Sequence, residues 1–195
     1  MKQAVILAAG EGQRLRPFTA NRPKSMLYIA DRPLLHYVID ALAANGIREI
    51  VLVVGYRKEQ VFDYFGAGQR FGVTIDYVNQ EKQLGTAHAL RQAAGKVEGD
   101  FLVLPADNYI DAGTIAPFIS EASPAVLVKR VDEPERYGVV EKSNGVIACI
   151  REKPESAGGN LVNTGIYAFS PDVFDYMERE LDIPDVLNLM IAEGV

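Results

Sequence analysis

Short apolar runs alternate with helical patterns over the first half of the chain, and this alternation restricts the fold more than any other feature. The runs cover 4–7, 50–54, 73–78 and 101–104, are rich in β-branched residues and are bounded by Gly, Asp or Pro, which is typical of buried strands. Between them, apolar residues at helical spacing predict helices over 34–42 and 61–65 and a third that Thr86 would cap. Strand–helix–strand units of this length produce parallel strands, so we predict an α/β fold with a mixed, mainly parallel sheet flanked by helices.

The second half of the chain has mainly strand patterns, with few helical patterns between them. Residues 126–128, 137–141, 146–150 and 166–169 read as strands with few helices between them, and Asn144-Gly145 favours a hairpin turn. We therefore expect an antiparallel flap or mixed strands here, followed by helices over 173–179 and 183–191. We expect residues 1–195 to form a single domain. Because the sheet would end on a helix with no return strand, we also expect this domain to lack its C-terminal part.

Composition excludes several classes of protein. A net charge of −6 argues against a nucleic-acid-binding surface, which would be basic. The single cysteine, Cys149, excludes an internal disulfide, and its place among alternating apolar residues predicts an inert buried thiol. No apolar run approaches the ~20 residues of a membrane span, and the first residues lack the features of a signal peptide. We expect a cytoplasmic protein with no nucleic-acid or membrane partner.

The first strand runs into a glycine loop, "QAVILAAGEGQRLRP" over 3–17. Ligands of open parallel sheets bind beyond the carboxyl ends of the strands. The loop is not a P-loop, because its glycines are two apart and no Lys-Ser/Thr follows. It is not a dinucleotide fingerprint either, because Leu15 occupies the third glycine position.

Cations gather on this loop. Between residues 11 and 24 lie four of them, against one acid, Glu11, which gives a local charge of 4 − 1 = +3; the four are Arg14, Arg16, Arg22 and Lys24. The glycines could simply turn the chain and leave these side chains in solvent. We favour a triphosphate site, since glycine admits phosphate to the backbone and arginine offers it a planar fork.

The motifs "LAAGEGQRLRP" and "RPKSMLYIADRPLLHYVIDAL" closely resemble those of the sugar-1-phosphate nucleotidyltransferases, also called nucleoside-diphosphate-sugar pyrophosphorylases. The resemblance runs from residue 2 to about 189 and continues through "QLGTAHAL", "LPADNYI", "YGVVE", "REKP" and "NTGIY", in the family's order. It implies the Rossmann-like fold of the nucleotide-diphospho-sugar transferases. It also implies transfer of a nucleotidyl group from a nucleoside triphosphate to a sugar-1-phosphate, with release of pyrophosphate.

The resemblance assigns three catalytic residues. Arg14 would hold the β- and γ-phosphates, Lys24 would lie near the α-phosphate, and Asp107 would bind the cofactor Mg²⁺. Asp107 could otherwise be an ordinary turn residue. The family's second metal aspartate belongs to a segment beyond residue 195, so the resemblance leaves the second carboxylate open, with Asp111 the nearest candidate.

The resemblance also assigns the base and sugar subsites. Gln80 would pair with uracil or thymine, and Gln83 would take its place if the loop register is shifted. We expect the two histidines, His36 and His88, to pack inside the protein or to face solvent. The nucleotide site as a whole would comprise Leu7, Ala8, Ala9, Gly10, Gly12, Gln80, Gly85 and Thr86. The sugar phosphate would contact Gly138, Glu152, Lys153, Asn163 and Thr164.

These assignments make UTP or dTTP the nucleotide and glucose-1-phosphate or N-acetylglucosamine-1-phosphate the acceptor. We also expect that the chain can form a homo-oligomer. A non-catalytic relative that binds nucleotide or nucleotide sugar without turnover, or an inactive truncated form, stays open beside the enzyme. A dinucleotide-dependent oxidoreductase would rest only on the sheet and the glycine loop.

Overall fold

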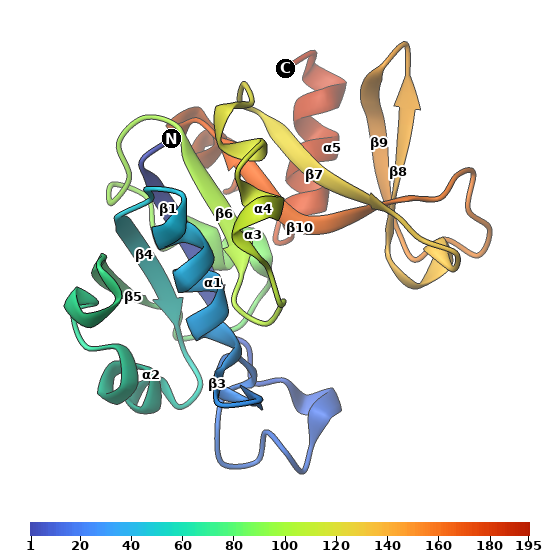
Figure 1. The fold of residues 1–195 in the computed structure, drawn as a ribbon. Helices are drawn as coiled ribbons and strands as arrows, with labels where there is room; N and C mark the ends of the chain where they lie inside the picture. Colours follow the sequence, from blue (N-terminus) through green and yellow to red (C-terminus); the bar gives the residue numbers. More distant parts are fainter.

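The parallel half of the sheet is built from the four strands that the sequence predicts. In the computed structural model, which describes all 195 residues, the strands β5, β4, β1 and β6 run parallel in this order (Figure 1). Their bounds are β1 Gln3–Ala8, β4 Glu49–Val54, β5 Thr74–Asn79 and β6 Phe101–Pro105. The helices that connect them are α1 Leu34–Ala44, α2 Lys58–Phe65 and α3 Thr86–Arg91.

The other half is antiparallel, as expected. Strand β10 (Leu161–Phe169) pairs antiparallel with β6, β7 (Ala125–Arg130) and β8 (Gly138–Ser143). The Asn144-Gly145 turn, with φ of 51° and 88°, joins β8 to β9 (Val146–Glu152). Figure 1 shows this β8–β9 hairpin projecting from the parallel strands, with α5 (Ile183–Glu193) nearest to it. The remaining elements are short: α4 (Ala112–Ile115) and the hairpin of β2 (Tyr28–Ile29) and β3 (Arg32–Pro33).

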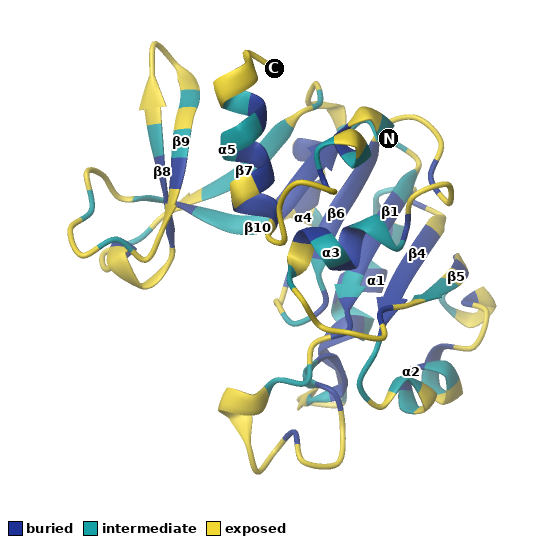
Figure 2. Cartoon of the chain, turned by 180° about the vertical axis from the view of Figure 1, so that it is seen from behind, coloured by how far each residue is buried: buried dark blue, intermediate teal, exposed yellow.

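Alternate residues of the parallel strands enter two separate cores. Ala4 and Ile6 of β1 pack in the core that includes α1 and α2, whereas Val5 packs in the core that includes α3 and α5. A strand that is buried on both faces needs apolar residues at every position, which explains the continuous apolar run. The central strands β1, β4 and β6 are accordingly buried over most of their length, while the tip of the β8–β9 hairpin is exposed (Figure 2). No helix combines the length and the apolar character required to cross a bilayer.

Three local predictions are wrong. Residues 173–179 do not form an α-helix: a 3₁₀ helix spans Pro171–Asp175, turns follow to residue 179, and the Leu181 carbonyl oxygen then accepts backbone hydrogen bonds from α3. Thr86 is the first residue of α3 rather than its cap. Cys149 is only half-buried, because β9 lies in the projecting hairpin, and its Sγ lies 3.4 Å from Oε2 of Glu141.

Candidate functional site

A cavity of about 600 Å³ opens at the carboxyl ends of β1 and β6. Its walls come from the glycine loop, the segment around residues 80–89, the middle of β10 and the start of α5. All the residues predicted for the nucleotide and for catalysis line it: Leu7, Ala8, Ala9, Gly10, Gly12, Arg14, Lys24, Gln80, Gly85, Thr86 and Asp107. The topology therefore brings together segments that are far apart in the sequence, from Leu7 to Ile183.

The glycine loop is fixed against the segment that carries Lys24. Gly12 has a φ of 71°, and a Cβ atom there would lie 2.9 Å from Cβ of Lys24. The buried Thr19 side chain donates a hydrogen bond to the Gly12 carbonyl oxygen at 2.8 Å. Both the backbone conformation and the close approach require glycine at this position.

The two arginines of the loop have different environments. Arg16 forms an ion pair with Glu11, and hydrogen bonds from Gln13 and Arg16 lower the pKa of that carboxyl. Arg14 lies in the 3₁₀ turn Gln13–Leu15, lines the cavity and forms no ion pair with a side chain of the chain. Arg14 is therefore the cation of this loop whose charge is available to an anionic ligand.

Lys24 and Asp107 form an ion pair inside the cavity. Lys24 begins the 3₁₀ turn Lys24–Met26, Asp107 follows β6, and Nζ of the lysine contacts Oδ2 of the aspartate. The two side chains are 35% and 33% exposed, so solvent and a ligand can reach both. A triphosphate would compete with Asp107 for the lysine, and a cation would compete with Lys24 for the carboxylate.

The chemistry of the donors suits a magnesium site completed by phosphate. The chain has no cluster of three or more His, Cys, Asp or Glu side chains placed to hold a metal. Mg²⁺, however, is commonly held by one or two carboxylates together with substrate phosphates and water. Asp107 fits such a site, and the other carboxylate in the cavity lining is Asp182, which the sequence analysis did not single out.

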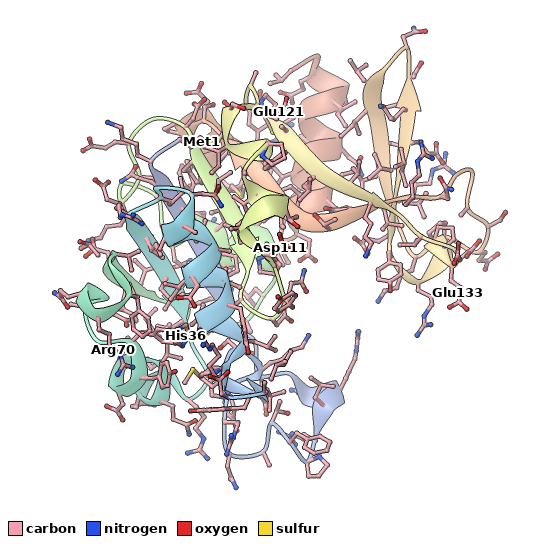
Figure 3. The ribbon with its side chains drawn as sticks, viewed as in Figure 1. Met1, His36, Arg70, Asp111, Glu121 and Glu133 are labelled. Atoms are coloured by element: carbon pink, nitrogen blue, oxygen red, sulfur yellow. The ribbon has the colours of Figure 1, made fainter.

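Asp111 is not part of this cavity. Its carboxylate caps α4 and accepts hydrogen bonds from the amide and the hydroxyl of Thr114, both at 3.0 Å. These hydrogen bonds lower the pKa of Asp111. Figure 3 shows the residue beside α4. Its suggested place as a second metal ligand is therefore wrong, because both of its oxygens serve the helix end.

The end of the cavity at residues 80–88 carries two glutamines. Gln80 is 4% exposed, and its Nε2 lies 3.2 Å from the carbonyl oxygen of Gly85 and 2.9 Å from Nδ1 of His88. Gln83 is exposed and donates through Nε2 to the carbonyl oxygen of Ala9 at 2.7 Å. His88 is thus a hydrogen-bond partner of Gln80, which the expectation of a packing or solvent-facing residue missed.

A segment from the far end of the chain completes this part of the wall. Oδ1 of Asp182 accepts hydrogen bonds from the Thr86 amide at 2.9 Å and the Thr86 hydroxyl at 3.0 Å. The Thr86 hydroxyl also accepts a hydrogen bond from the Ile183 amide at 2.9 Å. Gly85 has a φ of 148°, and a Cβ atom on it would lie 2.3 Å from the carbonyl oxygen of Leu181. The start of α5 therefore caps α3 and leaves no room for a side chain at residue 85.

The five residues predicted for the sugar phosphate do not line the cavity. Gly138, Glu152 and Lys153 lie at the base of the β8–β9 hairpin. Oε1 of Glu152 packs against Gly138, where a Cβ atom would be only 2.6 Å away, and burial raises the pKa of this carboxyl. Lys153 has a φ of 42°, a strained conformation for a residue with a side chain.

The other two sugar-site candidates are engaged within the protein. The side-chain amide of Asn163 donates to the Tyr167 hydroxyl at 2.7 Å and accepts from the Gly165 amide at 2.8 Å. Thr164 donates to the Leu127 carbonyl oxygen at 2.7 Å. The register of β10 shifts between Asn163 and Tyr167, and Gly165 and Tyr167, which lie at this irregularity, line the cavity. Burial raises the pKa of Tyr167 to about 12, so its phenol is neutral at physiological pH.

A second cavity, of about 550 Å³, carries no comparable site. It is lined by Arg32, His36, Asp40, Tyr64, Arg70 and Phe71, and Figure 3 shows His36 and Arg70 near α1 and α2. Nδ1 of His36 lies 3.0 Å from the Tyr64 hydroxyl, and its ring packs 4.9 Å from the Phe71 ring. Arg32 pairs with Asp40 at 3.0 Å, and Arg70 lies over the Tyr64 and Phe71 rings. The packing role expected for His36 is confirmed.

Comparison with known proteins identifies the same type of domain. The family described as Nucleotidyl transferase matches residues 3–195. The Bifunctional protein GlmU of Methanococcus maripaludis is 39% identical over 98% of this chain, which spans only 47% of that protein. The UTP–glucose-1-phosphate uridylyltransferase AglF of Haloferax volcanii is 38% identical over 98% of the chain and 84% of its own length. A crystal structure from Bacillus anthracis, assigned as a glucose-1-phosphate thymidylyltransferase, superposes with a TM-score of 0.91 at 32% identity over 99% of this chain and 84% of its own.

Proposed function

Because this chain belongs to the nucleotidyl transferase family, we propose that it transfers a nucleotidyl group from UTP or dTTP to a sugar-1-phosphate and releases pyrophosphate. One observation carries the proposal: unpaired Arg14 and the Lys24–Asp107 pair line one cavity at the carboxyl ends of β1 and β6. This is an arrangement of charges for a triphosphate and a cation. Two related proteins bear the names of a uridylyltransferase and a thymidylyltransferase that use glucose-1-phosphate.

In the proposed reaction, a phosphate oxygen of the sugar-1-phosphate attacks the α-phosphorus. The bond from that phosphorus to the bridging oxygen breaks, and pyrophosphate leaves with the electron pair. No side-chain nucleophile is needed, so the protein contributes alignment and charge neutralisation. Arg14 would bind the leaving pyrophosphate and Lys24 the α-phosphate, while Asp107 would hold Mg²⁺. The bound metal ion would supply neutralisation of phosphate charge.

Base and sugar selection rest on different supports. For the base, we assign Gln80 and the backbone at Gly85, which line the same cavity as Arg14. For the sugar phosphate, we assign Glu152 and Lys153 at the base of the β8–β9 hairpin, with Gly138, Asn163 and Thr164 beside them. The strained backbone of Lys153 supports a functional role there. Glucose-1-phosphate and N-acetylglucosamine-1-phosphate are both acceptors to be tested. These substrates suit a cytoplasmic enzyme, and a homo-oligomer can be tested by sedimentation.

The test separates binding from turnover. Calorimetry should show UTP or dTTP binding to the 195-residue chain more tightly with Mg²⁺ than without it, and Asp107→Asn should remove that difference. Pyrophosphate release should then be measured with each sugar-1-phosphate. Binding without release under every condition would favour the non-catalytic alternative. No binding of any pyrimidine nucleotide would overturn the proposed function.

A further inference from the structure

We infer that His88 is a positioning residue that sets which atom of Gln80 faces the nucleotide base. The inference rests on the proposed function, since it takes Gln80 as the residue that meets the base. A glutamine amide presents an acceptor on one side and a donor on the other, and each selects a different base edge. A protein that reads a base with glutamine therefore has to prevent the amide from rotating by 180°.

Two neighbours fix the nitrogen of the Gln80 amide. The atom that lies 3.2 Å from the Gly85 carbonyl oxygen has to be the nitrogen, because a carbonyl can only accept a hydrogen bond. The same nitrogen lies 2.9 Å from Nδ1 of His88. Both N–H groups of Nε2 are used only if Nδ1 carries a lone pair, which makes His88 a neutral imidazole with its proton on Nε2.

The amide oxygen is then the atom left for the ligand. Oε1 of Gln80 accepts no side-chain or backbone hydrogen bond among those the structure contains. Ser25 Oγ is the one fully buried side-chain polar atom without a hydrogen-bond partner. Oε1 of Gln80, which also has no partner, is therefore not fully buried. Gln80 is 4% exposed and lines the main cavity. The small accessible part of this side chain therefore includes an acceptor, available to a base.

An acceptor at this place discriminates among pyrimidines. Uracil and thymine carry N3–H, a donor, whereas N3 of cytosine is an acceptor that would face Oε1 with no proton between them. Rotating the amide to suit cytosine would place Oε1 against the Gly85 carbonyl oxygen and would remove both hydrogen bonds of Nε2. The pair of His88 and Gly85 thus holds the site in the form that accepts UTP or dTTP and rejects CTP.

The test compares UTP with CTP in binding calorimetry, with Mg²⁺ and without an acceptor sugar, so that turnover is not required. In His88→Phe, one N–H of Gln80 loses its partner, and we expect the ratio of UTP to CTP affinity to fall about tenfold. His88→Asn should retain most of the ratio, because its side-chain oxygen can accept in place of Nδ1. The matched control is His36→Phe, which removes the other histidine of the chain and should leave the ratio unchanged.

The outcomes separate this inference from the proposed function. A wild-type chain without preference for UTP over CTP would overturn the base-site assignment itself. A wild-type preference that His88→Phe leaves intact would overturn only the role of His88. If His88→Phe does not fold, nitrogen NMR of the wild-type protein decides, because its two histidines can be assigned with His36→Phe. An unprotonated Nδ1 in His88 at neutral pH supports the inference, and a protonated one overturns it.

Discussion

The parallel and antiparallel halves of this molecule differ in where their predicted site residues lie. In the parallel half, Arg14, Lys24, Asp107 and Gln80 all reach one cavity at the ends of the strands. In the antiparallel half, the predicted sugar-site residues lie outside that cavity, and Asn163 and Thr164 are bonded to other parts of the protein. Parallel strands bring all their carboxyl ends to one edge, whereas an antiparallel hairpin distributes its polar positions along its length. Motif position alone therefore locates a site in the first half but not in the second.

The largest effect should come from Arg14, the unpaired arginine that lines the cavity of the parallel half. Arg14→Ala should lower kcat by roughly 100-fold or more, because a charge that neutralises a leaving group acts mainly in the transition state. Steady-state kinetics with UTP or dTTP and a sugar-1-phosphate would measure it, on a form of the protein that turns over.

Arg16→Ala is the matched control for this prediction. Arg16 lies in the same loop but is paired with Glu11, so its loss should change kcat only a few-fold. Equal losses in the two variants would show that the charge of the loop, rather than the position of Arg14, is what matters. The contrast between the two arginines would then fail.

The second prediction tests the junction between the halves. Gly85→Ala would force a Cβ atom to within 2.3 Å of the Leu181 carbonyl oxygen, at a φ of 148°. Since backbone would have to move, we expect a loss of about 3 kcal/mol in the free energy of unfolding, measured with urea. Gly46→Ala is the control: its φ is 78°, but no atom lies within 4 Å of the new methyl group, so only the backbone cost of roughly 1 kcal/mol applies. Similar losses would mean that α5 does not constrain residue 85.

The third prediction concerns the same junction through its hydrogen bonds. Asp182→Ala removes the acceptor of the Thr86 amide and hydroxyl, and we expect a loss of roughly 1 to 2 kcal/mol in unfolding free energy, as for other helix caps. A double-mutant cycle with Thr86→Val should show coupling, because the two residues share these bonds. Additive losses would indicate that the two halves are held together by packing alone.

The sequence predicts elements better than it predicts contacts between them. The strands of both halves and the hairpin at Asn144-Gly145 follow from local residue patterns, and they are confirmed. The cap of α3 could not be foreseen, because Asp182 comes from 96 residues away. Of the predicted helix over 173–179, only the residues up to Asp175 are helical, as part of a 3₁₀ helix.

The candidate site divides in the same way. Cations on a glycine loop predict a phosphate site from sequence, but only the structure distinguishes Arg14 from the paired Arg16. Tyr167 also lines the cavity, at an irregularity in β10 that the sequence analysis did not predict. The sequence did not predict the hydrogen bond between His88 and Gln80, which only the distance between the two side chains shows.

The smallest effect is expected in the antiparallel half, at Glu152. The Glu152 residue is exposed overall, but partial burial of its carboxyl raises the pKa of this group in the folded protein above its unfolded value. A proton therefore binds the folded state more tightly, and the resulting stability is complete below the unfolded pKa and is lost as pH rises through the folded pKa. Glu152→Gln does not titrate, so the stability of the parent relative to this variant should fall as pH rises above the ordinary pKa of glutamate, about 4.3. Urea unfolding as a function of pH measures the difference, with Glu155→Gln as the control for loss of a neighbouring carboxylate. A difference that instead grows with pH would show that the nearby Lys153, rather than burial, governs Glu152, and it would make this carboxylate a member of a charged sugar-phosphate site even without ligand.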